Sequence, residues 1–441
     1  MDRSILSLEQ TPPLAVPLIF MLTAPFFAAS AALVVFVYPE AFESRWNPAM
    51  IAVTHLITLG FVTMVMIGAL QQLFPVLIGA PLPSPVLVSR WVYCGFITGI
   101  LALCSGILLI HPMLVGAGAF LLGLSIFILI GVLLRALVGS DATPMVTVGM
   151  KLAVLSFLGT IVLGLYLATS YIFPNVPLAR NLTSLHVGWG FLGWIGILII
   201  TVSYQVVPMF QVTPKYPGRV VRWLSPCVFV CLLGVSAVSL VDLLPHQLSS
   251  FVSLGIELVL LVSFVFYAVV TIRLQRKRKR KVPDITMKFW QLGLVCLLLS
   301  CCLFLVEMSG VSPGFGFGFD IDIDLAVGVL MLVGFTMSLI NGMLYKIIPF
   351  LIWLHLTNTI DMSLRWQLKI PNMKKIVPDV RAQRQFWVHS SALSLLLISL
   401  IESSFLPVAA LLFLLSNLFL AYNLIGGVNV YRQVLNQVKA L

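Results

Sequence analysis

Charged side chains are scarce in this chain of 441 residues: they make up 9% of it, whereas 60% of the residues are hydrophobic. A soluble globular protein carries roughly a quarter of its residues as charged side chains, because these cover its water-facing surface. So few charges exclude a water-soluble fold of this length. The mean hydropathy of +1.09 agrees, and the chain is predicted to be a membrane protein whose partner is the lipid bilayer.

Long polar stretches and alternating hydrophobicity are also missing. A helix needs about 20 consecutive apolar residues to cross the hydrocarbon core of a bilayer, and such runs fill nearly the whole chain. Because the runs do not alternate with a period of two, they exclude a transmembrane β-barrel. The expected fold is all-α and polytopic, a single membrane domain over residues 1–441 with about 12 transmembrane helices. These are expected at residues 15–38, 49–78, 87–110, 113–138, 144–172, 181–210, 221–244, 247–273, 286–310, 323–354, 385–404 and 406–431.

Basic residues are almost absent from one side of this topology. Only Arg45 and Arg180 fall there, and the remaining 24 of the 26 Lys and Arg residues fall on the opposite side. Since basic residues concentrate in cytoplasmic loops, both termini are predicted to be cytoplasmic, in a bacterial inner membrane. The net charge of +11 is then a consequence of topology and does not indicate nucleic-acid binding.

The second, sixth and tenth expected helices close with a shared pattern: a small residue, a polar or aromatic pair, two apolar residues, proline, and two more apolar residues. The prolines are Pro75, Pro208 and Pro349, which lie 133 and 141 residues apart, or four helices each time. A chance match is the alternative, since prolines are common near the ends of membrane helices. The period favours three four-helix repeats around a pseudo-threefold axis, at approximately residues 1–142, 143–281 and 282–441.

Four of the six histidines lie within or at the end of apolar segments. An ionisable side chain is costly there and marks a candidate functional site, and neutral imidazole is a common axial ligand of haem iron. His55 and His186 lie near the outer ends of the second and sixth helices, each followed by glycines and aromatic residues. Glycines can clear a groove for a flat macrocycle or simply allow close helix packing. Both histidines are predicted to bind haem iron.

The other two histidines, His355 and His389, fall near the cytoplasmic face, at the end of the tenth helix and the start of the eleventh. Consecutive helices that carry histidine at the same level can share one site. We therefore expect His355 and His389 to form a second haem or metal site. The alternative is a pair of interfacial histidines among the tryptophans of an aromatic belt.

The seven cysteines form no pattern that makes a site. All of them lie inside apolar segments, so they are interpreted as small buried residues and not as disulfides or a metal cluster. The chain also lacks the Cys-x-x-Cys-His sequence by which haem is attached covalently. Any haem is therefore expected to be of the non-covalent b type.

Twelve helices in three units of four, with histidine near the outer ends of the second and sixth helices, resemble subunit I of the haem-copper oxidases. The segments 55–79, 186–218 and 341–355 are most similar to divergent bacterial members of that family and to the NnrS family tied to nitric-oxide stress. Two features depart from the oxidases. The seventh helix, 221–244, lacks the histidine pair that helps to hold copper, and the outer half of the tenth lacks the paired haem histidines. The resemblance therefore implies haem b, one or more per chain, and no copper.

Roles for individual residues follow from this resemblance. It implies that His55 is the ligand of a low-spin haem and that His186 is a metal-facing histidine that binds haem iron. The missing ligand of the tenth helix leaves a sixth position, for which Met331 is the candidate because Met/His ligation of haem is well known. Arg45 and Arg180 are candidate partners of haem propionates, with ordinary headgroup contact as the alternative.

Three functions remain open from the sequence, and whether the protein is an enzyme is not decided. The first is electron transfer, or the handling of nitric oxide or oxygen, with a quinone or a respiratory redox partner. The second is membrane transport, since Glu257, Glu307, Lys346 and proline-broken helices can also build a path. The third is an assembly factor that carries haem or a metal to an oxidase.

Overall fold

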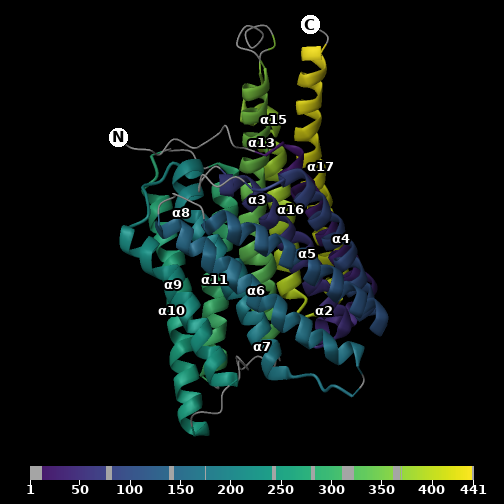
Figure 1. The fold of residues 1–441 in the computed structure, drawn as a ribbon, viewed down its shortest axis with the longest axis vertical. Helices are drawn as coiled ribbons and strands as arrows, with labels where there is room; N and C mark the ends of the chain where they lie inside the picture. The colour runs from purple at the N-terminus through teal and green to yellow at the C-terminus, as the bar shows by residue number, and fades with distance from the viewer. Residues whose placement is uncertain are drawn as a thin grey trace. The chain divides into compact units, whose positions relative to one another are not determined.

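The computed structural model describes residues 12–75, 82–138, 144–173, 175–240, 245–279, 284–309, 322–360, 368 and 370–439. Within these ranges the chain is helical and contains no β-strand (Figure 1). Eleven of the described helices are long and apolar enough to cross a membrane. The protein is therefore an all-α, polytopic membrane protein, as its composition indicates.

The described helices follow the apolar runs of the sequence closely, and short 3-10 turns join some of them. Most long helices begin at or next to the expected boundaries. The short connection expected near residue 111 is present between Leu108 and Pro112, whereas the one expected near residue 405 is longer and covers residues 399–405. The α-helices are α1 Ala15–Val37, α2 Pro48–His55, α3 Met64–Leu73, α4 Pro85–Leu108, α5 Pro112–Val138, α6 Pro144–Ile172, α7 Arg180–Gly188, α8 Leu198–Gln211, α9 Gly218–Leu240, α10 His246–Arg276, α11 Ile285–Met308, α12 Ile323–Val329, α13 Ser338–Thr359, α15 Met373–Ile376, α16 Asp379–Ile398 and α17 Leu406–Lys439.

Three π-helical segments, each with α-helix on both sides, interrupt these helices in the described part of the chain; Phe74 and Pro75, after α3, are also π-helical. The three segments are η3 Leu56–Thr63, η5 Trp189–Ile197 and η6 Leu330–Met337, and each joins two α-helices into one continuous apolar span. The three spans are Pro48–Leu73, Arg180–Gln211 and Ile323–Thr359. They correspond to the second, sixth and tenth helices that the sequence predicts.

The eleventh expected helix, at residues 385–404, differs most from expectation. The structure has helix α16 there, which begins six residues earlier at Asp379 and ends at Ile398. Its first turns carry Asp379, Arg381 and Arg384, and its middle carries His389. These polar residues explain why α16 is not among the eleven helices apolar enough to cross a membrane.

Capping residues explain where several helices begin. Asn47 accepts a hydrogen bond from the backbone N–H of Ala49, directly before Pro48 at the first position of α2. Asp284 accepts from Met287 at the start of α11, and Asp322 accepts from Leu325 at the start of α12. Such side-chain oxygens satisfy backbone donors that a helix leaves unpaired at its N-terminus.

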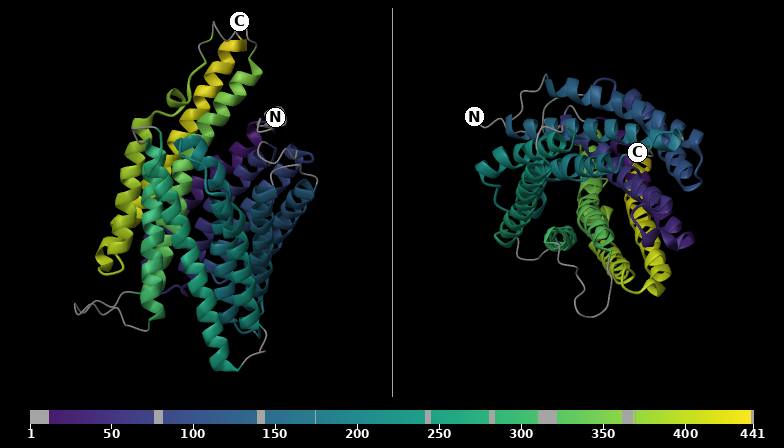
Figure 2. Two further views of the ribbon diagram at one scale, coloured as in Figure 1. Left: turned by 90° about the vertical axis from the view of Figure 1, so that its left-hand side faces the viewer. Right: turned by 90° about the horizontal axis from the view of Figure 1, so that it is seen from below.

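The chain divides into two compact units, each with its own core. The central unit is Leu70–Lys281, and the terminal unit joins Pro13–Ala69 to Val282–Leu441. In the terminal unit α1 packs along α17, so the first and the last helices of the chain lie side by side (Figure 2). In the central unit α4 and α5 form an antiparallel hairpin, and α6 packs on η5.

Candidate functional site: two histidines beside π-helical segments

His55 is the last residue of α2, immediately before the π-helical segment η3 in the terminal unit. Its imidazole Nδ1 lies 2.8 Å from the backbone carbonyl oxygen of Ile51, one turn earlier. Because a carbonyl can only accept, Nδ1 carries the proton and donates it. The lone pair of the neutral ring is then on Nε2.

His186 lies near the end of α7, just before η5 in the central unit. Its Nδ1 lies 3.0 Å from the carbonyl oxygen of Thr160, on the neighbouring helix α6. The imidazole packs against Gly164 of the same helix, where a methyl group would come within 2.9 Å of Cε1. His186 therefore has the same tautomer as His55, but another helix holds its ring.

The three π-helical segments recur at the same intervals as the three prolines. They begin at residues 56, 189 and 330, which lie 133 and 141 residues apart. The intervals between Pro75, Pro208 and Pro349 are identical. Sequence reasoning found the prolines and missed the π-helices. The available signal was a glycine followed by an aromatic residue at the fifth position of each segment, at 60–61, 193–194 and 334–335.

The three glycines at these fifth positions make the same kind of close contact. A methyl group on each would come within 2.8 Å of a side chain on the long helix that precedes it in the chain. The pairs are Gly60 with Phe27 of α1, Gly193 with Ser156 of α6, and Gly334 with Cys296 of α11. Each glycine therefore lets two helices of its own unit approach closely.

The glycine groove expected for a flat macrocycle is filled at Gly193, the third glycine after His186, and at the equivalent Gly60, whereas Gly188 meets only Leu232, at 3.8 Å. The space over Gly193 is taken by Ser156 and Leu232, and the space over Gly60 is taken by the ring of Phe27. The face of Gly196 meets the ring of Phe264 in the same way. Close helix packing, the alternative interpretation of the small residues, is what the structure has there.

The expected pairing of His355 with His389 is also wrong. His389 is fully buried, and its Nε2 lies 2.9 Å from the hydroxyl oxygen of Ser338, at the start of α13. His355 lies 17 residues further along the same helix, which is about 25 Å at 1.5 Å per residue. There its ring meets Tyr431 of α17 edge-on, with the ring centroids 5.7 Å apart. Helix α16 begins earlier than expected, which moves His389 away from the end of α13.

Met331 is the second residue of η6, in the terminal unit with His55. Its thioether sulfur lies 3.1 Å from the hydroxyl of Ser300 on α11. Segments η3 and η6 pack together, so Met331 lies on an element next to the one that follows His55. Met331 would have to exchange its Ser300 contact before its sulfur could bind a metal.

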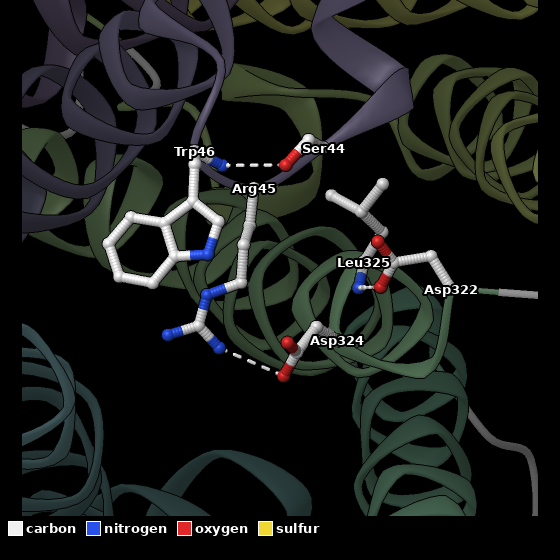
Figure 3. A network of polar contacts seen from close by, with 6 residues as sticks. All are labelled: Ser44, Arg45, Trp46, Asp322, Asp324 and Leu325. Atoms are coloured by element: carbon white, nitrogen blue, oxygen red, sulfur yellow. Dashed lines mark hydrogen bonds and ion pairs between the residues drawn. The ribbon is translucent and has the colours of Figure 1, made fainter. Parts of the chain in front are cut away.

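The guanidinium of Arg45, a candidate partner of a haem propionate, is already paired with a carboxylate. It donates to Asp324 at 2.9 Å and lies over the ring of Trp46, 4.9 Å from the ring centroid (Figure 3). Both members of the pair are partly exposed, so the ion pair is weak in energy and acts mainly to orient the two side chains. Arg180 is the first residue of α7, two turns before His186.

The terminal unit contains an ion pair of which the sequence pattern indicated only one member, Lys346. Lys346 Nζ is 2.7 Å from Asp284 Oδ2, with side-chain exposures of 18% and 5%. Lys346 belongs to the repeated pattern before Pro349 and was recognisable as an intramembrane charge. Asp284 precedes the apolar run of α11, so only the folded chain identifies it as the partner of Lys346.

The central unit contains a buried group of hydroxyls around the connection from α8 to α9. Tyr216, in that connection, is hydrogen-bonded to Thr271 of α10 at 3.0 Å. Its ring packs edge-on against Tyr204 of α8, with centroids 5.1 Å apart. Burial raises the pKa of Tyr216 to about 12, although its hydrogen bonds to Thr271 and Ser203 act to lower it. The phenol is therefore neutral at physiological pH and serves as a hydrogen-bonding group.

Metal ligands of other kinds do not gather in the part of the chain that the structure describes. No group of three or more His, Cys, Asp and Glu side chains lies close enough there to hold a metal ion. A haem needs only one or two axial side chains, so this finding leaves the two histidines as candidates. A comparison with protein-family models and with curated proteins finds no match to this chain.

Proposed function

We propose that this protein is a copper-free, b-type haem protein of the bacterial inner membrane, in which His55 and His186 are axial ligands of haem iron. One observation carries the proposal: each imidazole donates a hydrogen bond from Nδ1 to a backbone carbonyl oxygen, at 2.8 Å for His55 and 3.0 Å for His186. Metal-ligating histidines almost always donate their second ring N–H to a carbonyl, a carboxylate or water, which fixes the tautomer and orients the ring.

The donor chemistry of the two residues fits this group. With Nδ1 protonated, Nε2 has the lone pair that binds haem iron. Each histidine also precedes a π-helical segment within a residue or three, and π-helical turns are frequent at functional sites. His55 would hold haem from the terminal unit and His186 from the central unit. Bound haem supplies one-electron transfer and the binding of diatomic gases.

The proposed role is electron transfer in the membrane or the handling of nitric oxide or oxygen. A quinone or another respiratory component is the proposed redox partner. The absence of histidine from the α9 sequence supports a site without copper, since the oxidases that the chain resembles hold copper partly from that helix. The asymmetry of Lys and Arg supports a cytoplasmic location of both termini.

We also propose that the chain consists of three four-helix repeats around a pseudo-threefold axis, with twelve helices in total. The shared intervals of the π-helical segments and the prolines support this organisation. The equivalent contacts of Gly60, Gly193 and Gly334 with the preceding long helix support it further. In this arrangement α16 is the helix that completes the third repeat.

The experiment is a reduced-minus-oxidised absorbance spectrum of the purified protein, with pyridine haemochrome quantification. We expect a Soret band and b-type α-bands, and we expect His55→Ala to lose low-spin haem while the protein still inserts, because insertion depends on hydropathy. His111→Ala is the matched control, since His111 lies in the connection between α4 and α5. A colourless preparation from haem-replete cells would refute haem binding. An unchanged spectrum of well-expressed His55→Ala would show that His55 is structural.

A transporter is the second candidate, and the ion pair between Lys346 and Asp284 favours it. Lys346, three residues before Pro349, and Asp284, at the start of α11, form a largely buried ion pair that a translocation path can use. The same spectrum separates the two functions, because a transporter built on this ion pair needs no chromophore. Substrate-dependent flux that Lys346→Met abolishes in a colourless protein would support transport in place of haem chemistry.

A further inference from the structure

Three polar side chains lie along one face of α13 in the terminal unit. Ser338, Asn341 and Tyr345 are spaced by three and four residues, which places them on the same side of a helix. We call them the polar row. Asn341 is fully buried, and within the described residues neither atom of its amide has a hydrogen-bond partner. A buried amide in this state is rare, because an unmade hydrogen bond destabilises the fold.

Two neighbouring helices add buried polar atoms in the same state. His389 Nδ1 on α16, and Trp290 Nε1 and Thr286 Oγ1 on α11, have no hydrogen-bond partner in the described part of the chain. His389 lies against the polar row, because its Nε2 is 2.9 Å from Ser338 Oγ. Helix α11 reaches the row at Thr286, whose carbonyl oxygen would be 3.1 Å from a methyl group on Gly342. The orphan atoms therefore belong to α13 and to the two helices, α11 and α16, that contact its polar row.

The polar row ends at the ion pair between Lys346 and Asp284. Lys346 follows Tyr345 directly and is eight residues beyond Ser338, or about 12 Å along the helix axis. Asp284 is the N-cap of α11, so this end of the row lies where α11 begins. The row thus connects a charged group at the start of a span with a buried histidine further inside it.

We propose that the polar row holds a chain of internal water molecules, and that this water carries protons between the Lys346–Asp284 ion pair and His389. Buried water typically makes about three hydrogen bonds to groups that are otherwise unsatisfied, and the orphan amide of Asn341 offers donors and an acceptor midway. A length of about 12 Å corresponds to about four hydrogen bonds of 2.8 Å.

The direction of the hydrogen bond at His389 determines which nitrogen receives the proton. His389 is hydrogen-bonded to the backbone of Val333, whose carbonyl can only accept, and its Nδ1 has no partner among the described residues, so Nε2 carries the proton. The lone pair of the imidazole is then on Nδ1. A water molecule gives its proton to Nδ1 and takes one from the next water, and the water at the far end of the row takes one from bulk water. The imidazolium then releases its Nε2 proton to the Ser338 hydroxyl, which lies 2.9 Å away and passes its own proton back to the water of the row. The ring is then neutral again and its N–H has been exchanged. The inference does not depend on haem, since it uses only residues of α11, α13 and α16.

Hydrogen–deuterium exchange of the full-length protein in nanodiscs tests this proposal. With ¹⁵N-labelled histidine and tryptophan, NMR follows the ring N–H groups of His389 and Trp290 after transfer to deuterated buffer. Trp189, whose indole donates to Ser236 at 2.8 Å in the central unit, is the internal reference. His389 and Trp290 are almost fully buried. We nevertheless expect their ring N–H groups to exchange at least ~10-fold faster than that of Trp189, because internal water reaches them.

Asn341→Leu removes the middle of the water chain and is expected to slow exchange at both His389 and Trp290 by ~10-fold or more. The matched control is Asn417→Leu on α17, where a buried asparagine donates to the carbonyl of Phe413 in its own helix. It should leave both rates unchanged. Wild-type rings as slow as Trp189 would overturn the proposal without any variant. Fast exchange that Asn341→Leu does not change would also overturn it, because protons would then arrive by another route.

Discussion

The buried ion pair of the terminal unit offers the sharpest test of the fold. Lys346 and Asp284 are 2.7 Å apart, with only 18% and 5% of their side chains exposed. At an effective dielectric constant of about 20, charges at this distance attract by about 6 kcal/mol, before the cost of removing both from water. Breaking such a pair from one side leaves an uncompensated buried charge and costs about 3–5 kcal/mol. We therefore expect Lys346→Met and Asp284→Asn each to destabilise the protein by that amount.

The double variant decides whether the loss comes from the ion pair. Asparagine remains a good N-cap, so Asp284→Asn removes the charge and keeps the cap of α11. Unfolding in mixed micelles should then show that Lys346→Met with Asp284→Asn costs clearly less than the sum of the single changes, with a coupling of about 2 kcal/mol or more.

An exposed ion pair in the same unit provides the control. Lys374 and Asp379 are 3.5 Å apart with 61% and 49% exposure, so Lys374→Met should cost less than about 1 kcal/mol because solvent screens the pair. The reasoning fails if the two Lys346 and Asp284 variants are additive, or if each costs no more than this control.

Three further outcomes are expected. Gly334→Ala should destabilise the protein by about 1–3 kcal/mol, because its new methyl group meets Cys296 Cβ at 2.7 Å. Gly328→Ala is the control: its methyl group meets no described atom of a neighbouring element within 4 Å, so it should be neutral or stabilising in the same unfolding assay. Tyr216→Phe should remove a phenolate absorbance step near pH 12, above the ordinary 10.0. The stability that neutral Tyr216 contributes is present below pH 10 and lost as pH rises to about 12. If the absorbance step that Tyr216→Phe removes lies at pH 10 instead, the phenol is exposed to solvent and the reasoning is wrong. Metal analysis should find no stoichiometric copper, and one copper per chain would contradict the haem-only proposal.

The sequence determined the class of the protein and most of its helices, because both depend on local properties. A span needs only a continuous apolar run, and the runs from Ala15 to Leu441 define nearly all the observed helix boundaries. At its beginning α16 departs most, because its polar first turns weaken the apolar signal there. Helix α17 continues eight residues beyond its expected end at 431, to Lys439. The three prolines also indicated where the chain repeats, since a fixed interval can be read without knowing any contact.

Tertiary structure alone decided what each candidate residue contacts. His55 bonds within its own helix and could be anticipated as a well-oriented imidazole, but His186 bonds Thr160 on α6, 26 residues away. Arg45 pairs with Asp324 across 279 residues of sequence. His389 lies beside Ser338, at the start of α13, and not beside the end of α13 that precedes it in the chain. The packing of α16 on its neighbouring helices determines this position. Hydropathy depends on one segment at a time, whereas these contacts depend on which helices meet and at what height, and no local pattern encodes that.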